Sequence, residues 1–385
     1  MRIFYLTRTY PSEIFGGGGI IRKGTIDHLR KNGYEVWVIS PNYDGTGVDV
    51  NDDHKHILLP HVGNFKFCSF LETIGFWEDY MAGWVYYAVR YLRKILKKED
   101  LLFATSGGEL GTIILAKKLA DIIGCKYVIN LHDPISFTTV NGEVARYIKT
   151  KFRHVTRDKT EYKYLFSASA IITSSESYRD CLMQKYPAFA PKISCHHFGY
   201  IKSFQYSKKK PEGRINIVYG GAMGELQSPE ILAEAVGGIE NVKVVFVGNW
   251  RSNPKLIQYE RCSNIDLIDV LPNREYIKYL QDNADVGFVS LKGQLAEICV
   301  PSKLYEFINL GLPILGILGG DGKNIIRNNL YGVVVRYSVQ SLRDAILDIS
   351  NPKKLLMYKS NVIRDREKWA MDYQIRDILS VISKI

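Results

Sequence analysis

Two charged side chains follow a helix-start signal in the segment CVPSKLYEFINLG. Pro301 and Ser302 are typical of a helix start, with Ser302 as the expected cap. The helix would point its free amides and the positive end of its dipole at a ligand, and Lys303 would add a full charge. Glu306 follows one turn later and is suited to accept hydrogen bonds from a ribose diol. We expect phosphate and ribose to bind here side by side, although an ordinary capped helix with surface charges has the same pattern.

A glycine-rich turn follows a buried strand in YGGAMGELQSPEILAEA. Gly220, Gly221 and Gly224 lie between the strand and the next helix, and Gln227 comes just before that helix. The turn is similar to a phosphate cradle without a lysine. A purely structural turn explains the same residues equally well.

A histidine and an aspartate end another apolar run in KYVINLHDPIS. We expect His132 and Asp133 to lie just past a strand, at the edge where parallel sheets bind ligands. A histidine there can hydrogen-bond a substrate hydroxyl or stabilise a developing charge. The alternative is a histidine whose hydrogen bonds are satisfied within the fold.

Four consecutive glycines, 16–19, separate the first strand from the first helix. They match neither the GxxxxGK[ST] phosphate loop nor a tight GxGxxG dinucleotide turn, because residues 8–15 intervene. The glycines would instead leave bare amides that approach an anion or a sugar at a helix N-terminus. Gly17 and Gly18 are the expected contacts, and a merely flexible loop is the alternative.

Strands and helices alternate along the whole chain, which indicates parallel, doubly wound sheets. The predicted fold is α/β, with two Rossmann-like domains facing a cleft. Residues 1–200 would form the first domain and 201–364 the second, joined by a basic linker near 200–213. The expected helices include 20–32, a long amphipathic helix over 77–98, and a final helix, about 365–385, that packs back on the first domain.

The composition agrees with two globular domains. The chain has 385 residues, of which 46% are hydrophobic and 24% charged, and this excludes a largely disordered protein. Its six cysteines are scattered singly, which argues against a zinc site or a disulfide framework. The start predicts no signal peptide, and the apolar run LYEFINLGLPILGILGG is too interrupted to span a bilayer.

Several of these motifs together resemble the GT-B glycosyltransferases, specifically retaining family 4 and its branch acting on nucleotide-activated amino-deoxy sugars in surface polysaccharide assembly. VPSKLYEFINLGLPIL carries the most specific likeness, and GAMGELQS and ADVGFVSL support it. The first half fits more loosely, through the glycine loop, ATSGG, HD and AIITSSESYRDCL. The resemblance covers nearly the whole chain.

The resemblance implies a retaining transfer from a nucleoside diphosphate sugar, with UDP as the expected nucleotide and no cofactor or metal. Glu306 matches the ribose-binding carboxylate. The positions near the diphosphate are matched by Pro301, Ser302, Lys303, Gly221 and Gln227. His132 and Asp133 match the region of the transferred sugar. The glycine loop, with Gly17 and Gly18, matches the one that closes over the donor.

The chain departs from the family pattern near the sugar. Much of family 4 has a glutamate eight residues before the ribose glutamate, whereas this chain has Ile298 there and Glu297 one position off. The usual arginine and lysine of the phosphate turn are replaced by Ala222 or Met223 and by Gln227. These departures concern the sugar contacts more than the nucleotide site.

The acidic and histidine-rich run NDDHKH, residues 51–56, is expected to be a solvated loop rather than a metal site. Net charge is +11, with basic clusters at 90–98, 146–163 and 208–210. Solvated helix faces and a linker explain these clusters about equally well. The alternative expectation is a cytoplasmic protein attached peripherally to the inner face of the plasma membrane through the basic and aromatic surfaces of 77–98 and 146–163. The expected acceptor is a glycan or a lipid-linked glycan, and nucleic acid is not an expected partner.

Two other functions remain open at this stage. One is a GT-B epimerase or hydrolase that acts on the nucleotide sugar itself. The other is a catalytically silent GT-B module that binds anionic glycan or nucleic acid through its basic face.

Overall fold

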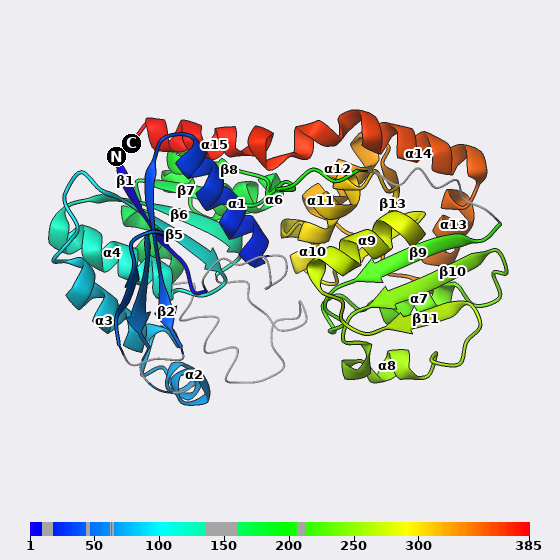
Figure 1. Ribbon diagram of the computed structural model, residues 1–385, viewed down its shortest axis with the longest axis horizontal. Coiled ribbons are helices and arrows are strands. Elements are labelled where there is room, and N and C mark those ends of the chain that lie inside the picture. Colours follow the sequence, from blue (N-terminus) through cyan, green and yellow to red (C-terminus); the bar gives the residue numbers. More distant parts are fainter. Residues whose placement is uncertain (10–17, 44–46, 62, 64, 136–159, 206–212) are drawn as a thin grey trace. The chain divides into compact units, whose positions relative to one another are not determined.

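The computed structural model describes the chain except for residues 10–17, 44–46, 62, 64, 136–159 and 206–212. It consists of two α/β units (Figure 1). Unit 1 comprises Met1–His197 and Ile375–Ile385, and unit 2 comprises Phe198–Gln374. The sequence placed the boundary near residue 200 and the returning segment at 365–385; in the structure the returning segment begins at Ile375.

Unit 1 contains an eight-stranded sheet in the order β3-β4-β2-β1-β5-β6-β7-β8. All neighbours are parallel except β3 and β4, which are antiparallel. Figure 1 shows α3 and α4 together on one side of this sheet and α1 on the other. The strands are β1 (Arg2–Leu6), β2 (Glu35–Asn42), β3 (Asp49–Asn51), β4 (His56–Pro60), β5 (Leu101–Gly107), β6 (Lys126–Asp133), β7 (Ala170–Thr173) and β8 (Ile193–Cys195). The helices include α1 (Gly18–Lys31), α2 (Phe65–Thr73), α3 (Ala82–Leu92), α4 (Gly111–Ile123), residues 160–167, α6 (Glu176–Lys185), the 3-10 helix η2 (Pro187–Lys192) and α15 (Met371–Ser383), whose first four residues belong to unit 2.

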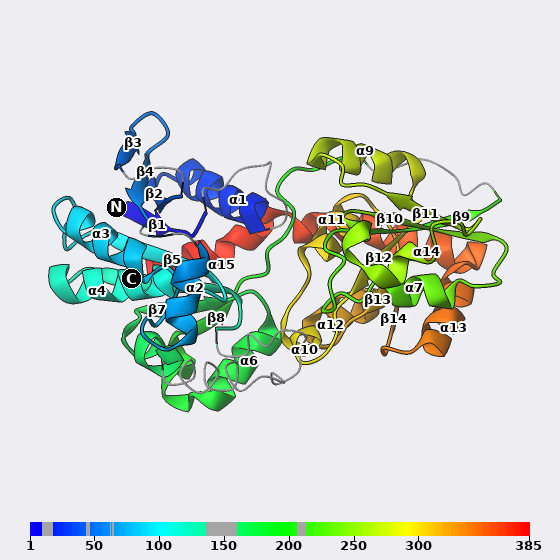
Figure 2. The same ribbon diagram turned by 90° about the horizontal axis from the view of Figure 1, so that it is seen from below.

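Unit 2 contains a six-stranded parallel sheet in the order β11-β10-β9-β12-β13-β14. Helices α7 and α13 pack together on one face, and α9 lies on the other (Figure 2). The strands are β9 (Ile215–Gly220), β10 (Val242–Val247), β11 (Ile265–Ile268), β12 (Val286–Ser290), β13 (Ile314–Ile317) and β14 (Gly332–Val335). The helices are α7 (Glu230–Ala235), η3 (Trp250–Ser252), α8 (Pro254–Ile257), α9 (Asn273–Asn283), α10 (Leu295–Ile298), α11 (Ser302–Asn309), α12 (Gly320–Asn328), α13 (Val339–Ile349), α14 (Pro352–Asp365) and η4 (Arg366–Trp369).

The central strands are almost wholly apolar because helices cover both faces of each sheet. All but the last residue of β5 are buried, as are all residues of β12 and β13. A half-exposed strand alternates apolar and polar residues, whereas these strands do not. They therefore stand out in the sequence as continuous apolar runs. The end of α4 was equally visible, because Gly124 adopts φ +79° in the left-handed region that glycine favours. The two parallel sheets predicted from the sequence are confirmed.

The long helix predicted over 77–98 is wrong in extent. Helix α3 covers only Ala82–Leu92. Before it, the buried Asp79 carboxylate accepts hydrogen bonds from the N–H groups of Met81, at 3.0 Å, and Leu110, at 2.9 Å. These bonds stabilise a turn, because they tie Asp79 to the backbone of a distant segment.

The final helix is also interrupted. Helix α14 ends at Asp365, and α15 begins only at Met371, so the predicted start at 365 was wrong. Between them, the backbone of Tyr200 bonds to Trp369 O at 2.8 Å and to Met371 N at 2.7 Å. Pairing with Tyr200 holds Ala370 in an extended conformation, and the helix therefore cannot continue. No helix in the described part of the chain is long and apolar enough to cross a membrane.

Helix α11 packs closely on the sheet of unit 2 because one strand residue has no side chain. A Cβ atom on Gly287, in β12, would lie 2.4 Å from the ring of Phe307. The Phe307 side chain is fully buried. The position of α11 therefore depends on a glycine at 287.

Substituting Gly287 by alanine should destabilise the protein by about 1 to 3 kcal/mol through overpacking. Denaturant unfolding of G287A measures this change. The matched control is G237A, since a Cβ on Gly237 would meet only Glu234 O, at 3.4 Å. Equal stability of G287A and G237A would contradict the packing argument.

Candidate functional site

The cap of helix α11 lies one residue earlier than predicted. Pro301 occupies the N-cap position with φ −61° and ψ 133°, and it makes no side-chain capping bond. Ser302 is the first helical residue, so the prediction that Ser302 caps the helix was wrong. Proline has no side-chain acceptor for the first-turn amides. Leu304 N–H donates to Pro301 O at 3.0 Å, so the amides of Ser302 and Lys303 are the ones suited to an anionic ligand.

Lys303 and Glu306 neutralise each other in the structure. Lys303 Nζ lies 2.6 Å from Glu306 Oε2, and both side chains are partly buried. Lys303 Nζ also lies 4.3 Å from the ring centroid of Tyr276, a cation–π contact. The ion pair therefore fixes both side chains before any ligand binds.

Tyr276, in α9, is the residue of this site that the sequence did not single out. Its hydroxyl fits into space left by a glycine, because a Cβ on Gly220 would lie 2.2 Å from it. The hydroxyl is buried and has no hydrogen-bond partner among the residues that the structure describes. Burial, with a contribution from the Glu306 carboxylate, raises the pKa of Tyr276 well above its usual value, and the phenol stays neutral. In the sequence Tyr276 was one of two tyrosines in REYIKYL, and nothing distinguished it from the other.

The glycine turn after β9 lies beside Lys303. Gly221 has φ +138°, and a Cβ there would lie 3.9 Å from Lys303 Cε. Its own N–H donates to Val247 O at 3.1 Å and is therefore already used. Gln227 lies further along the turn, where its N–H donates to Gly224 O at 3.1 Å and its carbonyl accepts from the Ser290 hydroxyl. The structure thus brings Gly221, Lys303 and Glu306 together. The backbone hydrogen bonds of Gln227 are made within the turn and to Ser290.

Glu297 lies one position away from the place where much of family 4 has a glutamate, and its carboxylate accepts a backbone hydrogen bond. Gly320 N–H donates to Glu297 Oε2 at 3.1 Å, at the first residue of α12. A Cβ on Gly319 would lie 2.2 Å from Glu297 Oε1. The carboxylate therefore caps α12, where a negative charge is favourable.

In unit 1, His132 and Asp133 are the last two residues of β6 rather than residues just past it. His132 is 6% exposed, and its Nε2 lies 2.7 Å from Asn130 Oδ1. Because that oxygen is an acceptor, we assign the proton to Nε2. Burial, and then the positive charges of Arg22, His196 and Arg8, hold the pKa of His132 well below its usual value. His132 is therefore a neutral hydrogen-bonding group, not a cation.

The described part of the glycine loop lies beside Arg22. Gly17 lies outside the described residues. Gly18 begins α1, and a Cβ there would lie 3.8 Å from two guanidinium nitrogens of Arg22. Arg22 Nη2 is also 3.6 Å from the position of a Cβ on Gly107, and Asp133 Oδ2 is 3.5 Å from the same point. Gly18, Arg22 and Asp133 thus gather at the carboxyl edge of the sheet.

A family model and several solved structures are similar to this chain. Residues 15–199, just under half the chain, match the model of Glycosyltransferase Family 4. Solved structures similar to the whole chain include HepE from Anabaena in complex with UDP-glucose, with a TM-score of 0.72, 14% identity and 100% of both chains covered. The fold is GT-B.

Two more GT-B structures show the same extent of likeness. Sucrose-phosphate synthase from Thermosynechococcus elongatus has a TM-score of 0.73 and 14% identity, with 100% of this chain and 98% of that chain covered. WaaG, a glycosyltransferase involved in lipopolysaccharide biosynthesis, has a TM-score of 0.72 and 13% identity over 99% of each chain. No curated protein sequence matches this chain significantly.

The expectation that all of residues 51–56 form a solvated loop was wrong for His56. In this GT-B chain, residues 52–55 form a turn, whereas His56 begins β4 and is buried. Its Nε2 lies 2.9 Å from Ser40 Oγ. Burial lowers the pKa of His56 to about 4. Within the described ranges no group of three or more His, Cys, Asp or Glu side chains is placed to hold a metal ion, and metal independence stays a prediction.

His56 should make stability depend on pH. Below pH 6.5 the unfolded chain binds a proton at this residue and the folded protein does not, so stability is lost as the pH falls from 6.5 towards 4. The expected slope is up to about 1.4 kcal/mol per pH unit for this one histidine. Urea unfolding between pH 7 and pH 5 should show a shallower loss in H56Q than in the unmodified protein. The exposed neighbour His54 supplies the control H54Q, and equal slopes in H56Q and H54Q would contradict the assignment.

Proposed function

We propose that this protein is a retaining glycosyltransferase. It moves a sugar from a nucleoside diphosphate sugar, with UDP as the nucleotide, to a glycan or lipid-linked acceptor in surface polysaccharide synthesis. The observation that carries the proposal is the cluster of Gly221, Tyr276, Lys303 and Glu306 at the start of α11. The UDP-glucose complex of HepE, which has the same fold, supports a UDP-linked donor.

Each group in the cluster has a chemical task in this proposal. The carboxylate of Glu306 accepts hydrogen bonds from the ribose diol, and Lys303 lies where it can turn from Glu306 to the diphosphate. The uncapped amides of α11 stabilise the negative charge that develops on the leaving diphosphate, in a partly buried place where such interactions are strong. The buried Tyr276 hydroxyl, unpartnered within the described structure, is available to a ligand group.

Unit 1 would contribute to the sugar end of the reaction. Neutral His132 positions the donor sugar by hydrogen bonding as its bond loosens, and Asp133 lies beside it at the end of β6. Glu297 caps α12, so it is not assigned to the sugar. We propose a metal-independent reaction in which the second-unit groups replace a cation. The transferred sugar is proposed to be a hexose or an N-acetylamino sugar.

Removing either charge of the pair should weaken UDP binding and abolish transfer. K303A leaves an unpaired, partly buried carboxylate that repels the diphosphate, and E306A removes the ribose contact. The expected loss of UDP affinity is roughly tenfold or more in each variant, the scale of a charge-assisted hydrogen bond. Thermal shift with UDP, GDP and ADP sugars measures binding, and turnover on the best binder measures transfer.

The control for this test is K278A. Lys278 also pairs with an acid one turn away, Asp282, at 2.9 Å, but on an exposed face of α9. Full activity in both K303A and E306A would contradict the site. Release of a free altered sugar in place of transfer would favour an epimerase or hydrolase. Salt-sensitive polyanion binding, without any thermal shift on adding UDP, would favour a silent module.

We also propose that unit 1 attaches peripherally to the cytoplasmic face of an anionic membrane. Two groups of exposed side chains support this: aromatic and aliphatic residues on and after α2, and aromatic and basic residues on and after α3. They are Phe67, Phe70, Ile74 and Phe76 in the first group, and Tyr86, Tyr87, Arg90, Arg93, Lys94, Lys97 and Lys98 in the second. The basic segment 146–159 lies outside the described residues. A lysine or arginine near an anionic surface contributes about 1 kcal/mol.

Vesicle co-sedimentation tests this attachment. The protein should bind vesicles that contain anionic lipid at low salt, and high salt should release most of it. Reversing Lys94, Lys97 and Lys98 to glutamate should reduce binding, whereas reversing Lys353 and Lys354, in the first turn of α14 of unit 2, should not. Equal binding to neutral and anionic vesicles would contradict the proposal.

A further inference from the structure

At the carboxyl edge of the unit 1 sheet, the missing side chain of Gly107 leaves a space for about one methyl group, which we call the hollow. Strands β5 and β6 are neighbours, and their last residues, Gly107 and Asp133, pair after a shift of register that skips His132. A Cβ on Gly107 would lie 3.5 Å from Asp133 Oδ2, 3.5 Å from Glu109 Oε2 and 3.6 Å from Arg22 Nη2. Three charged side-chain ends thus face a position where the chain has no side chain.

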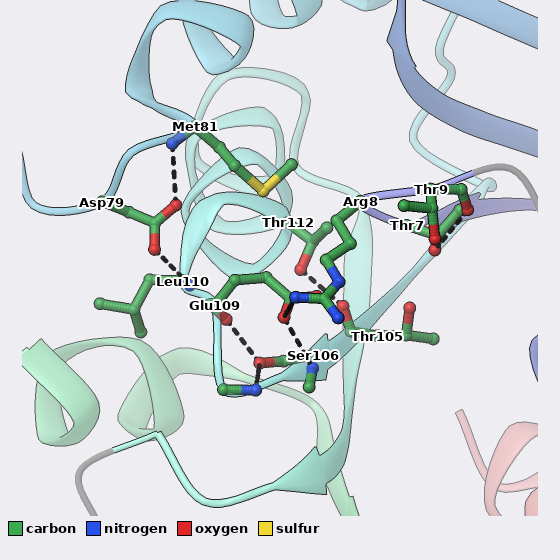
Figure 3. Close-up of polar contacts among 12 residues, drawn as sticks. Thr7, Arg8, Thr9, Asp79, Met81, Thr105, Ser106, Glu109, Leu110 and Thr112 are labelled. Carbon is green, nitrogen blue, oxygen red and sulfur yellow. Dashed lines mark hydrogen bonds and ion pairs between the residues drawn. The ribbon is translucent and has the colours of Figure 1, made fainter. Parts of the chain in front are cut away.

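Glu109 is the under-coordinated member of this group. Its side chain is 1% exposed. Oε2 accepts a hydrogen bond from Gly107 N–H at 2.9 Å, and Arg8 Nη1 lies 3.6 Å away, beyond ordinary hydrogen-bond length (Figure 3). Oε1 is buried and has no hydrogen-bond partner within the described structure. A carboxylate can accept about four hydrogen bonds, so this one retains unused capacity.

The backbone around Glu109 is held firmly. Ser106 Oγ donates to Glu109 O at 2.5 Å and accepts from Gly108 N–H at 3.2 Å. Leu110 N–H donates to the buried Asp79 carboxylate at 2.9 Å. Figure 3 shows these bonds surrounding the turn between β5 and α4, with Arg8 reaching across it. The turn presents the Glu109 carboxylate in a preset place, the condition under which a hydrogen bond to a ligand discriminates well.

Arg8 holds the outer side of the carboxylate. The Tyr43 hydroxyl donates to Arg8 O at 2.9 Å and anchors its backbone. The side chain of Arg8 is 42% exposed, so its guanidinium meets both solvent and Glu109. Two guanidinium groups and two carboxylates together give the hollow no net charge. Sugar hydroxyls suit such a mixture, because each can donate to a carboxylate and accept from a guanidinium.

We propose that Glu109 is a specificity-determining residue that accepts a hydrogen bond from a hydroxyl of the acceptor sugar, and that Arg8 positions its carboxylate. The inference rests on the proposed function, which supplies the acceptor. Acceptors that lack a hydroxyl at this position leave the buried carboxylate unsatisfied and are discriminated against.

Two variants and one control test this role in the full-length protein. E109Q keeps the shape and removes the charge. G107A fills the hollow with a methyl group, and the distances of 3.5 to 3.6 Å are ordinary contacts that the fold tolerates. The control D100N alters a carboxylate that is similarly buried, pairs with Arg2 at 2.6 Å, and lies at the opposite end of β5.

The readout is saturation-transfer NMR titration with methyl glycosides of glucose, galactose and N-acetylglucosamine. At least one glycoside should bind, and its Kd should rise roughly tenfold in E109Q and in G107A but not in D100N. With acceptor turnover, the same variants should raise KM for the acceptor while KM for the donor stays unchanged.

The outcomes separate this inference from the proposed function. Glycoside binding that is absent, or that E109Q and G107A leave unchanged, overturns the inference even when UDP still gives a thermal shift. An equal loss in D100N also overturns it, because the effect would then be general destabilisation. Glycoside binding that depends on Glu109 without any UDP shift supports the inference and counts against the proposed function.

Discussion

Glycines that make room for aromatic rings determine where the candidate site of unit 2 can form. Phe307 packs on Gly287 and fixes α11 against the sheet, and Tyr276 packs on Gly220 and brings α9 to the end of β9. Lys303 reaches the Tyr276 ring only because both helices are held this closely. The site therefore depends on close packing between helices and strands, more than on the polar residues themselves.

The ion pair between Lys303 and Glu306 changes how an anion would be recognised here. A free lysine would attract a diphosphate directly, whereas a paired lysine is locally neutralised. The attraction that remains comes from the uncapped first turn of α11 and its dipole. A ligand that offers a diol to Glu306 and phosphate oxygens to Lys303 replaces the pair with two new charge-assisted contacts. A nucleoside diphosphate has both groups.

In unit 1 the charges are arranged differently. Two arginines and two acidic residues meet near Gly107, while the neighbouring His132 is kept neutral by burial and by the positive charges around it. A neutral imidazole can orient a sugar hydroxyl without supplying a proton, which agrees with a reaction whose main requirement is stabilisation of the leaving diphosphate. Here too a glycine at a strand end leaves room for the polar groups.

The sequence by itself determined the two parallel sheets, most of the helices, and the segments that carry the site. Fully buried strands and glycine stops such as Gly124 leave local signals, and VPSKLYEF combines a helix start with charges at helical spacing. Local signals could not reveal Tyr276, the capping role of Glu297, the bond from Gly221 N–H to Val247, or the turn that Asp79 stabilises. Each of these depends on a partner distant in sequence. The break at Ala370 has the same origin, because Tyr200 supplies its hydrogen bonds. Tertiary structure decided these features, since the identity of a residue does not specify which distant backbone group or ring will lie beside it.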